Sequence, residues 1–206
     1  MRAYIFAGGA IDPANIYCKP REGDLTIAAD SGWHNAGLLG ITPQILLGDF
    51  DSIGGDSLPE AKEILQVPVE KDRTDTQLAV DLALSRGATE VVIIGGLSGR
   101  LDHALSNFGV LETLAERNIY AVIEDGFNRV RFIHNTGLLV ARSAYTYLSL
   151  LAADKVVKGV SVEGCKYPLK NARLARNCGF TVSNEITGNC ALVEVRRGGI
   201  YVMESK

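Results

Sequence analysis

The chain has 206 residues, of which 47% are hydrophobic, and a formal net charge of −3 at pH 7. A chain of this length can bury roughly 70% of its unfolded surface, so it needs no disulfide or metal to fold as one large or two small domains. No apolar run is long enough to cross a bilayer, and the first apolar stretch is too short for a signal peptide. We therefore expect a cytoplasmic protein that does not enter a membrane.

The charge and the cysteines exclude two further classes. A net charge of −3 gives no general reason to expect nucleic-acid binding, which usually shows as a basic patch. A compact anionic ligand remains compatible with it, because local charge can oppose the net charge. The four cysteines lie far apart with no paired spacing, which argues against a zinc site or a disulfide framework and predicts free thiols: Cys18, Cys165, Cys178 and Cys190.

Strand-like and helix-like segments alternate throughout residues 1–125. This pattern predicts an α/β domain with a mostly parallel sheet. Thr74 and Gln77 form a capping-box pattern that starts one of the helices. We expect strands at the opening residues 1–6 and at 24–29, 45–47, 67–69, 90–94 and 119–124, and helices over 33–39, from 74 to about 87, and from 101 to about 117 with Leu101, Leu105, Phe108 and Leu111 on the buried face.

Two acidic clusters follow apolar segments of strand type, and they organise the rest of the prediction. They are Gly48 to Ser52 (GDFDS) and Lys71 to Asp75 (KDRTD). Loops at the carboxyl ends of parallel strands share one crevice, where four carboxylates would repel one another unless a cation lay between them. Magnesium is usually held by one or two carboxylates and substrate phosphates. We therefore expect Mg²⁺ and a nucleoside triphosphate.

Calcium binding, helix capping and simple solvation remain alternative roles for these acids. Asp49 to Glu60 can be laid over a twelve-residue calcium loop, but Ile53 offers no ligand at the fifth position. The acids can also be ordinary solvated loop residues. Asp75 lies in a predicted first helical turn, where the helix dipole alone favours a negative charge, and Asp30 can be a helix cap.

A glycine-rich loop runs from Gly95 to His103 (GGLSGRLDH). Strand, glycine loop and helix N-terminus together predict an anion cradle to which Arg100 adds a charged fork. The loop lacks the Gly-Lys-Ser/Thr ending of a P-loop. The glycines of Ala7 to Ala10 would let the backbone approach a phosphate or would simply make a turn, and this signal is weak by itself. Asp102 is placed to cap the helix, and His103 is either a phosphate donor or an ordinary exposed histidine.

The pattern changes after Asp125 to short β-type runs separated by turn signals, such as residues 130–134, 145–151 and 156–162. Residues 194–202 resemble a hairpin with a Gly198-Gly199 turn. The predicted architecture is therefore an α/β domain over residues 1–125 and an all-β sandwich domain over residues 126–206.

The ordered set of motifs resembles the thiamine pyrophosphokinase family. The two acidic clusters and the Gly95 loop match in family order, followed by Gly164 to Leu169 and Val182 to Glu185 (VSNE). The resemblance implies an ATP-binding α/β domain, a thiamine-binding and dimerisation β-sandwich, and a homodimer. It also implies Mg²⁺-dependent transfer of diphosphate from ATP to the thiamine hydroxyl with release of AMP.

The resemblance assigns roles to particular residues. The implied catalytic and metal-binding residues are Asp49, Asp51, Asp72 and Asp75; the implied ATP-binding residues are Asp30, Lys71, Gly95, Gly96, Gly99, Arg100, Asp102 and His103; Ser183 and Asn184 are implied to meet thiamine. Ser98 and Trp33 depart from the family pattern. Neither change removes a charged group, so these departures affect how the substrate fits more than how the reaction proceeds.

Two other functions remain open from the residues. One is an Asp-x-Asp phosphatase, for which Asp49 and Asp51 after a strand are a passable match although Ile53 is the wrong residue. The other is a nucleotide-sensing or metal-binding module without turnover. Phosphoryl-type transfer asks the protein mainly to position the reactants and to offset charge, which the predicted groups can do.

Overall fold

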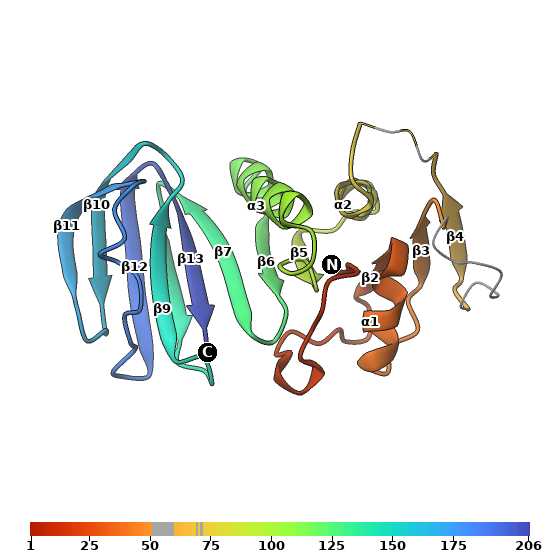
Figure 1. The fold of residues 1–206 in the computed structure, drawn as a ribbon, viewed down its shortest axis with the longest axis horizontal. Coiled ribbons are helices and arrows are strands. Elements are labelled where there is room, and N and C mark those ends of the chain that lie inside the picture. Colours follow the sequence, from red (N-terminus) through yellow and green to blue (C-terminus); the bar gives the residue numbers. More distant parts are fainter. Residues whose placement is uncertain (51–59, 69, 71) are drawn as a thin grey trace. The chain divides into compact units, whose positions relative to one another are not determined.

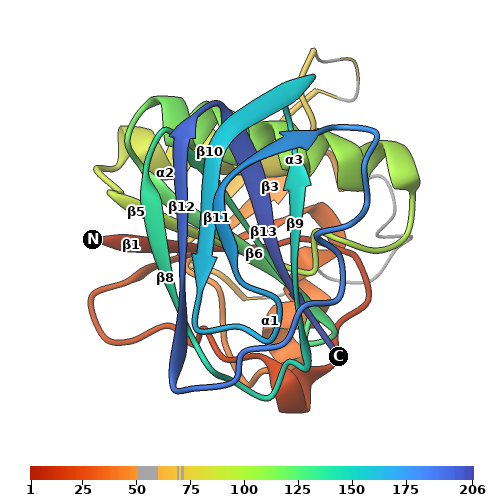
Figure 2. The ribbon, with the colours of Figure 1, turned by 90° about the vertical axis from the view of Figure 1, so that its left-hand side faces the viewer.

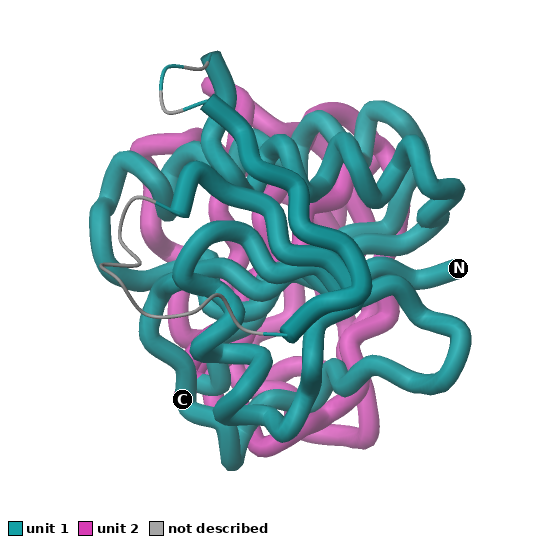
Figure 3. Tube along the Cα trace, turned by 90° about the vertical axis from the view of Figure 1, so that its right-hand side faces the viewer, with its two compact units in different colours: residues 1–126 teal, residues 127–206 magenta. Residues whose placement is uncertain are grey.

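The computed structural model describes residues 1–50, 60–68, 70 and 72–206. These divide into two compact units, Met1–Gly126 and Phe127–Lys206 (Figure 3). The first unit contains all the helices of the described residues, and the second contains only strands and connecting turns (Figure 1). The fold is therefore a mostly parallel α/β unit followed by an antiparallel β unit, as the sequence predicts.

The first unit is built on a parallel sheet of six strands. Their order is β4-β3-β2-β1-β5-β6, and every neighbouring pair runs parallel. The strands are β1 (Arg2–Phe6), β2 (Leu25–Ala29), β3 (Ile45–Gly48), β4 (Glu63–Gln66), β5 (Glu90–Ile94) and β6 (Tyr120–Glu124). Burial of every residue of β2 and of residues 91–94 of β5 fits a parallel sheet that is covered on both faces.

Three α-helices cover this sheet. They are α1 (Trp33–Leu38), α2 (Asp75–Ser85) and α3 (Leu101–Glu116), with short 3₁₀ turns η1 (Pro13–Asn15) and η2 (Asp30–Gly32). Helix α1 lies on one face and α2 and α3 lie on the other (Figure 1). Tyr4 and Phe6 of β1 pack with Ala36 of α1 in one hydrophobic core.

Two expectations for this unit are wrong. Strand β4 covers Glu63–Gln66 and not residues 67–69, since Val67 and Pro68 lie outside it and Val69 lies outside the described residues. Proline cannot donate to a strand ladder. In α3, Leu101 and Leu105 are 72% and 60% exposed, and the buried residues are Ala104, Asn107, Val110, Leu111 and Leu114.

The second unit is a sandwich of two antiparallel sheets. One has the order β7-β13-β9 within this unit, and the other has the order β11-β10-β12-β8 (Figure 2). Side chains from both sheets form one apolar core. The strands are β7 (Asn128–His134), β8 (Gly137–Ala141), β9 (Tyr147–Ala152), β10 (Val156–Glu163), β11 (Leu169–Ala175), β12 (Cys190–Arg197) and β13 (Gly199–Ser205).

The predicted hairpin at Gly198 is also wrong. The backbone does reverse there, with φ of 105° at Gly198. However, β12 pairs with β8 and β10, whereas β13 pairs with β7 and β9. The turn therefore carries the chain from one sheet of the sandwich to the other.

Two further expectations can be compared with the structure. All four cysteines are free thiols, as predicted. Among the helices of the described residues, none combines the length and apolar character that a membrane crossing requires.

Candidate active site

The strand order reverses between β1 and β5. From β1 the chain builds outward through β2 and β3 to β4, and it then returns to the other side of β1 to form β5 and β6. Ligands of open α/β sheets bind in the crevice outside the carboxyl ends of the strands at such a point. The two glycine turns, at Gly8-Gly9 after β1 and at Gly95-Gly96 after β5, flank this crevice.

A cavity of about 260 Å³ occupies the crevice. It brings together many of the predicted ATP-binding groups and one predicted metal ligand, Asp75. Its lining comprises Ala7, Gly8, Gly9, Ala29, Asp30, Ser31, Thr74, Asp75, Thr76, Gly95, Gly96, Ser98, Gly99, Arg100, His103, Ala104 and Asn107. Both glycine loops and the N-terminal ends of α2 and α3 therefore open onto one space.

A buried asparagine on α1 fixes the backbone of the first glycine turn. The side-chain amide of Asn35 donates to the carbonyl oxygens of Ala7 and Gly9 at 2.6 and 2.7 Å. The same nitrogen would lie 2.6 Å from a Cβ at Gly95, where φ is +82°. Only glycine fits this position, because the turn and the amide leave no room for a side chain.

A second buried asparagine, on α3, fixes the second glycine turn. The Asn107 side-chain amide donates to the Gly96 carbonyl oxygen at 2.9 Å. Ser98 links the two loops, because its hydroxyl donates to the Ala10 carbonyl oxygen at 3.2 Å. The sequence motifs did not identify Asn35 and Asn107 as site residues. Each is a polar residue within a predicted helix, and the structure shows that both are buried.

The end of β3, which precedes the first acidic cluster, lies beside Asp30, and Asp49 itself is not part of the cavity lining. Asp30 lines the cavity in a left-handed backbone conformation, with φ of 48°. A Cβ at Gly48 would lie 3.0 Å from the Asp30 Cα, so the two backbones are in close contact. Asp49, the next residue after β3, therefore leaves the sheet beside Asp30.

The start of α2 places Asp75 at the cavity. The Thr74 hydroxyl accepts from the Gln77 backbone N–H at 3.2 Å, and the Gln77 side chain accepts from the Thr74 N–H at 3.0 Å, which confirms the predicted capping box. The Gln77 amide also donates to the Ser106 hydroxyl of α3 at 3.3 Å. The helix start that presents Asp75 is thus tied to the neighbouring helix.

Arg100, and not Asp102, is the N-cap residue of α3, and it makes no side-chain capping bond. Asp102 lies in the first turn and is not part of the cavity lining. Its carboxylate pairs with the Arg100 guanidinium at 2.6 Å. This pairing lowers the pKa of the Asp102 carboxyl and raises the pKa of Arg100.

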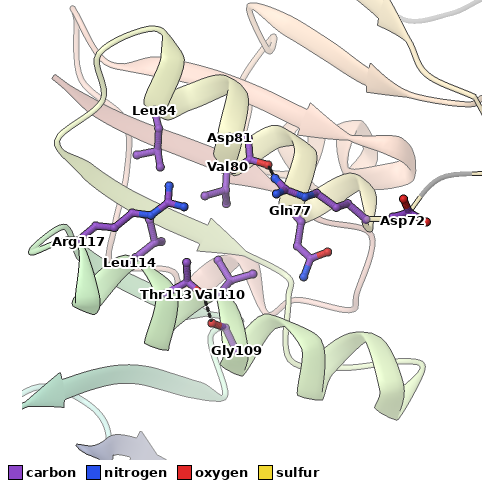
Figure 4. Close-up of a pocket in the computed structure, with 11 residues that line it drawn as sticks. Asp72, Gln77, Val80, Asp81, Leu84, Gly109, Val110, Thr113, Leu114 and Arg117 are labelled. Atoms are coloured by element: carbon purple, nitrogen blue, oxygen red, sulfur yellow. Dashed lines mark hydrogen bonds and ion pairs between the residues drawn. The ribbon is translucent and has the colours of Figure 1, made fainter.

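Asp72 is not among the residues that line this cavity. It lines a separate groove of about 290 Å³ between α2 and α3, together with Arg73, Asp81 and Arg117 (Figure 4). Arg73 forms an ion pair with Asp81. The structure therefore brings Asp75 and Asp30 to one cavity, and Asp72 lines the groove between α2 and α3.

Two predicted site residues, Asp51 and Lys71, lie outside the described residues. Within residues 1–50, 60–68, 70 and 72–206, no three His, Cys, Asp or Glu side chains are grouped as a metal cluster. Two carboxylates, those of Asp30 and Asp75, line the cavity. This donor set fits magnesium, which commonly takes one or two protein carboxylates and completes its shell with water and substrate phosphates.

Ser183 and Asn184 lie in the second unit. Ser183 has φ of 62°, and its N–H donates to the Ser149 hydroxyl at 3.0 Å. The Asn184 side chain accepts from the Tyr167 N–H at 3.0 Å and donates to the Tyr167 carbonyl oxygen at 2.8 Å. Asn184 also lines a small hollow of about 80 Å³ with Tyr167, Phe180 and Val182.

The fold and the cavity define a class: an α/β domain with a phosphate-type cradle at its switch point, joined to a β-sandwich. The family model described as "Thiamin pyrophosphokinase, catalytic domain" matches residues 21–123, half of the chain. The model described as "Thiamin pyrophosphokinase, vitamin B1 binding domain" matches residues 136–200. The chain belongs to the thiamin pyrophosphokinase family.

Individual relatives agree with this assignment. The thiamine pyrophosphokinase of Bacillus subtilis (strain 168) is 28% identical over 189 residues, which cover 89% of this chain and 88% of that protein. The crystal structure of thiamine pyrophosphokinase from Bacillus subtilis superposes with a TM-score of 0.88 at 27% identity, covering 100% of this chain and 99% of that one. The thiamin pyrophosphokinase structure from Geobacillus thermodenitrificans gives 0.85 at 26%, covering 100% and 98%.

The comparisons support neither alternative function. No phosphatase and no binding module without turnover is among these relatives, all of which are named as pyrophosphokinases.

Proposed function

We propose that this chain transfers diphosphate from ATP to the hydroxyl of thiamine, giving thiamine diphosphate and AMP. The observation that carries the proposal is the cavity at the switch point between β1 and β5, into which two glycine turns, Arg100, His103 and the carboxylates of Asp30 and Asp75 all open. Family membership supports the same reaction.

The phosphates of ATP would lie against the glycine turns. Gly95 and Gly99 have φ of +82° and +87°, and the N-terminus of α3, a helix of 16 residues, follows them directly. Backbone N–H groups and the positive end of the helix dipole favour an anion there. The guanidinium of Arg100 at the rim adds a planar fork that can bind two phosphate oxygens at once.

Asp75 and Asp30 are the described carboxylates that would hold magnesium, with Asp49, Asp51 and Asp72 as the further members of the proposed set. When bound, magnesium would supply Lewis-acid chemistry by offsetting the negative charge of the transferring group. The chain's own contribution is then to position the acids: the capping box fixes Asp75, and the contact between Gly48 and Asp30 fixes the strand end before Asp49.

We assign the ATP-binding role to residues 1–125 and the thiamine-binding and dimerisation role to residues 126–206. Asn184 and the hollow beside it are the polar and apolar elements that would meet the thiamine rings. A homodimer in the cytoplasm, with thiamine shared between subunits, completes the proposal. Mixing an Asp75→Asn protein with an Asn184→Ala protein tests sharing, because hybrid dimers would regain one intact site.

The deciding experiment is incubation of the purified protein with ATP, magnesium and thiamine, followed by mass spectrometry. We expect equal amounts of AMP and thiamine diphosphate. Formation of ADP, release of inorganic phosphate alone, or the absence of any thiamine-dependent product would contradict the proposal. Omitting thiamine is the control for ATP hydrolysis.

A further inference from the structure

Charge is divided very unevenly between the two units. Residues 1–126 contain nine Lys and Arg against nineteen Asp and Glu, a net charge of −10. Residues 127–206 contain twelve Lys and Arg against five Asp and Glu, a net charge of +7. The net charge of −3 for the whole chain therefore conceals a strongly basic β unit.

Part of this positive charge is aligned across one sheet. Lys158 of β10 lies directly opposite Arg197 of β12 and directly opposite Arg173 of β11. An exposed Lys or Arg is ordinary on a protein surface, but like charges directly opposite one another destabilise a sheet. In the described part of the chain, none of these three side chains has an ion-pair partner.

The same end of the sandwich gathers further cations. Lys155 and Arg176 adjoin the row, and the Arg176 N–H donates to the Lys155 carbonyl oxygen at 3.2 Å. We call the following set the basic end: Lys155, Lys158, Arg173, Arg176 and Arg197.

A cavity opens at the basic end. It has a volume of about 390 Å³ and is lined by His134, Asn135, Asp154, Val156, Lys158, Arg197 and Gly198. Lys158 and Arg197 come from one sheet and His134 from the other, so the cavity lies at the mouth of the sandwich. The single acid in the lining, Asp154, accepts the Gly199 N–H at 2.9 Å and is thereby held against the turn.

The basic end is separate from the segment proposed to meet thiamine. Asn184 pairs with Leu148 near the start of β9 and with Tyr167 after the end of β10. The basic end lies after the end of β9 and around the start of β10. The length of β9 therefore separates the two, roughly 20 Å at the usual rise per residue.

We propose that the basic end binds a compact anion that carries several phosphate groups. Two cationic side chains and His134 around one hollow suit an inorganic oligophosphate or the phosphate chain of a nucleotide, since charged forks bind phosphate oxygens strongly. A hollow bounded by two sheets favours a compact ligand over an extended polymer. This site is independent of the proposed catalytic cavity, which lies in the other unit.

The probe is inorganic triphosphate, titrated into the intact protein in low-salt buffer without magnesium and followed by backbone amide NMR. We expect saturable shifts at Asn135, Gly198 and Gly199. The double variant Lys158→Gln/Arg197→Gln should weaken this binding by about tenfold or more, the scale of losing charge-assisted contacts. The variant Arg142→Gln/Lys170→Gln removes the same charge from exposed positions at the other end of the unit and should bind unchanged.

Resonances of residues 95–99 report binding at the catalytic cavity separately, and AMP formation from ATP and thiamine should be unaffected in both double variants. The proposal is overturned if the basic-end resonances do not move, or if both double variants lose the same affinity. It is also overturned if a short single-stranded RNA binds there more tightly than triphosphate, because the site would then be one for nucleic acid. Urea midpoints equal to the wild-type value confirm that the variants fold.

Discussion

Arg100 and Asp102 form a two-pronged pair at the rim of the candidate active site. The Arg100 Nη2 lies 2.6 Å from the Asp102 Oδ2, and the Arg100 Nε lies 3.2 Å from the Asp102 Oδ1. The same carboxylate accepts the His103 N–H at 2.9 Å. The guanidinium is thus oriented by a neighbour that any phosphate ligand must displace or share.

Replacing Arg100 with Lys should raise the KM for ATP by about tenfold while leaving the KM for thiamine nearly constant, because Lys keeps the charge but loses the planar fork. Steady-state kinetics at fixed saturating thiamine measures this. The matched control is Arg86→Lys, at an exposed ion pair with Glu63, which should behave as wild type. An Arg100→Lys protein with unchanged ATP dependence would remove Arg100 from the phosphate site.

Asp75→Asn should lower turnover by at least about a hundredfold at saturating magnesium, the scale of losing a key electrostatic group. Asp51→Asn should do the same. Folding should be preserved, because the Thr74 and Gln77 capping box does not use the Asp75 side chain. Asp81→Asn on the same helix lines the groove instead of the cavity and should keep near-normal turnover. Normal activity in the Asp75 and Asp51 variants would refute a shared magnesium site.

Gly95→Ala should destabilise the protein by about 2 kcal/mol or more, because alanine is strained at positive φ and its Cβ would meet Asn35. Gly109→Ala is the contrasting change. Gly109 lies inside α3, where an added Cβ meets nothing within 4 Å, so alanine should stabilise by about 0.5 to 1 kcal/mol. Urea unfolding of both proteins measures the difference, and equal midpoints would show that the glycine turn is less constrained than its geometry indicates.

Asn184→Ala should raise the KM for thiamine much more than the KM for ATP. The change removes the hydrogen bonds to the Tyr167 backbone and therefore loosens one wall of the neighbouring hollow. Separate titrations of thiamine and ATP provide the measurement, with the exposed Asn189→Ala as control. If the two KM values rise together, Asn184 stabilises the fold without forming part of the thiamine pocket.

The thiols should differ in reactivity. Burial raises the pKa of the Cys165 thiol, so a smaller fraction of this side chain is thiolate at a given pH. The Cys178 side chain is exposed. Iodoacetamide at about pH 8 should therefore label Cys178 first and Cys165 only slowly, with the Cys165 rate still rising as the pH increases further. Peptide mapping by mass spectrometry gives the rates. Equal labelling of Cys165 and Cys178 in the folded protein would contradict the burial of Cys165.

The parts of the fold that depend on local sequence were predictable. Strand β5 coincides with the predicted residues 90–94, and the capping box at Thr74 starts α2 as expected. Both predictions depend on residues close together in the chain, because capping hydrogen bonds and the spacing of apolar side chains are local properties of the sequence.

The errors concern choices that local sequence leaves open. Leu101 and Leu105 have the right spacing for a helix face, but α3 buries Asn107 instead, because its amide bonds the Gly96 carbonyl. The reversal at Gly198 was visible, whereas the pairing of β13 with β7 and β9 depends on strands far away in the chain.

The pairing of β1 with β5 also constrains the order in which the protein can form. Residues 2–6 pair with residues 90–94, so the centre of the first sheet closes only after some ninety residues of chain have been made. In the second unit, β13 is the last strand along the chain and lies between β7 and β9. Long-range pairings of this kind slow folding, because chain entropy is lost before the contacts form. During synthesis, the first sheet cannot close until β5 has been made, and the sandwich cannot close until β13 has been made. Until then, the incomplete sheets expose unpaired strand edges.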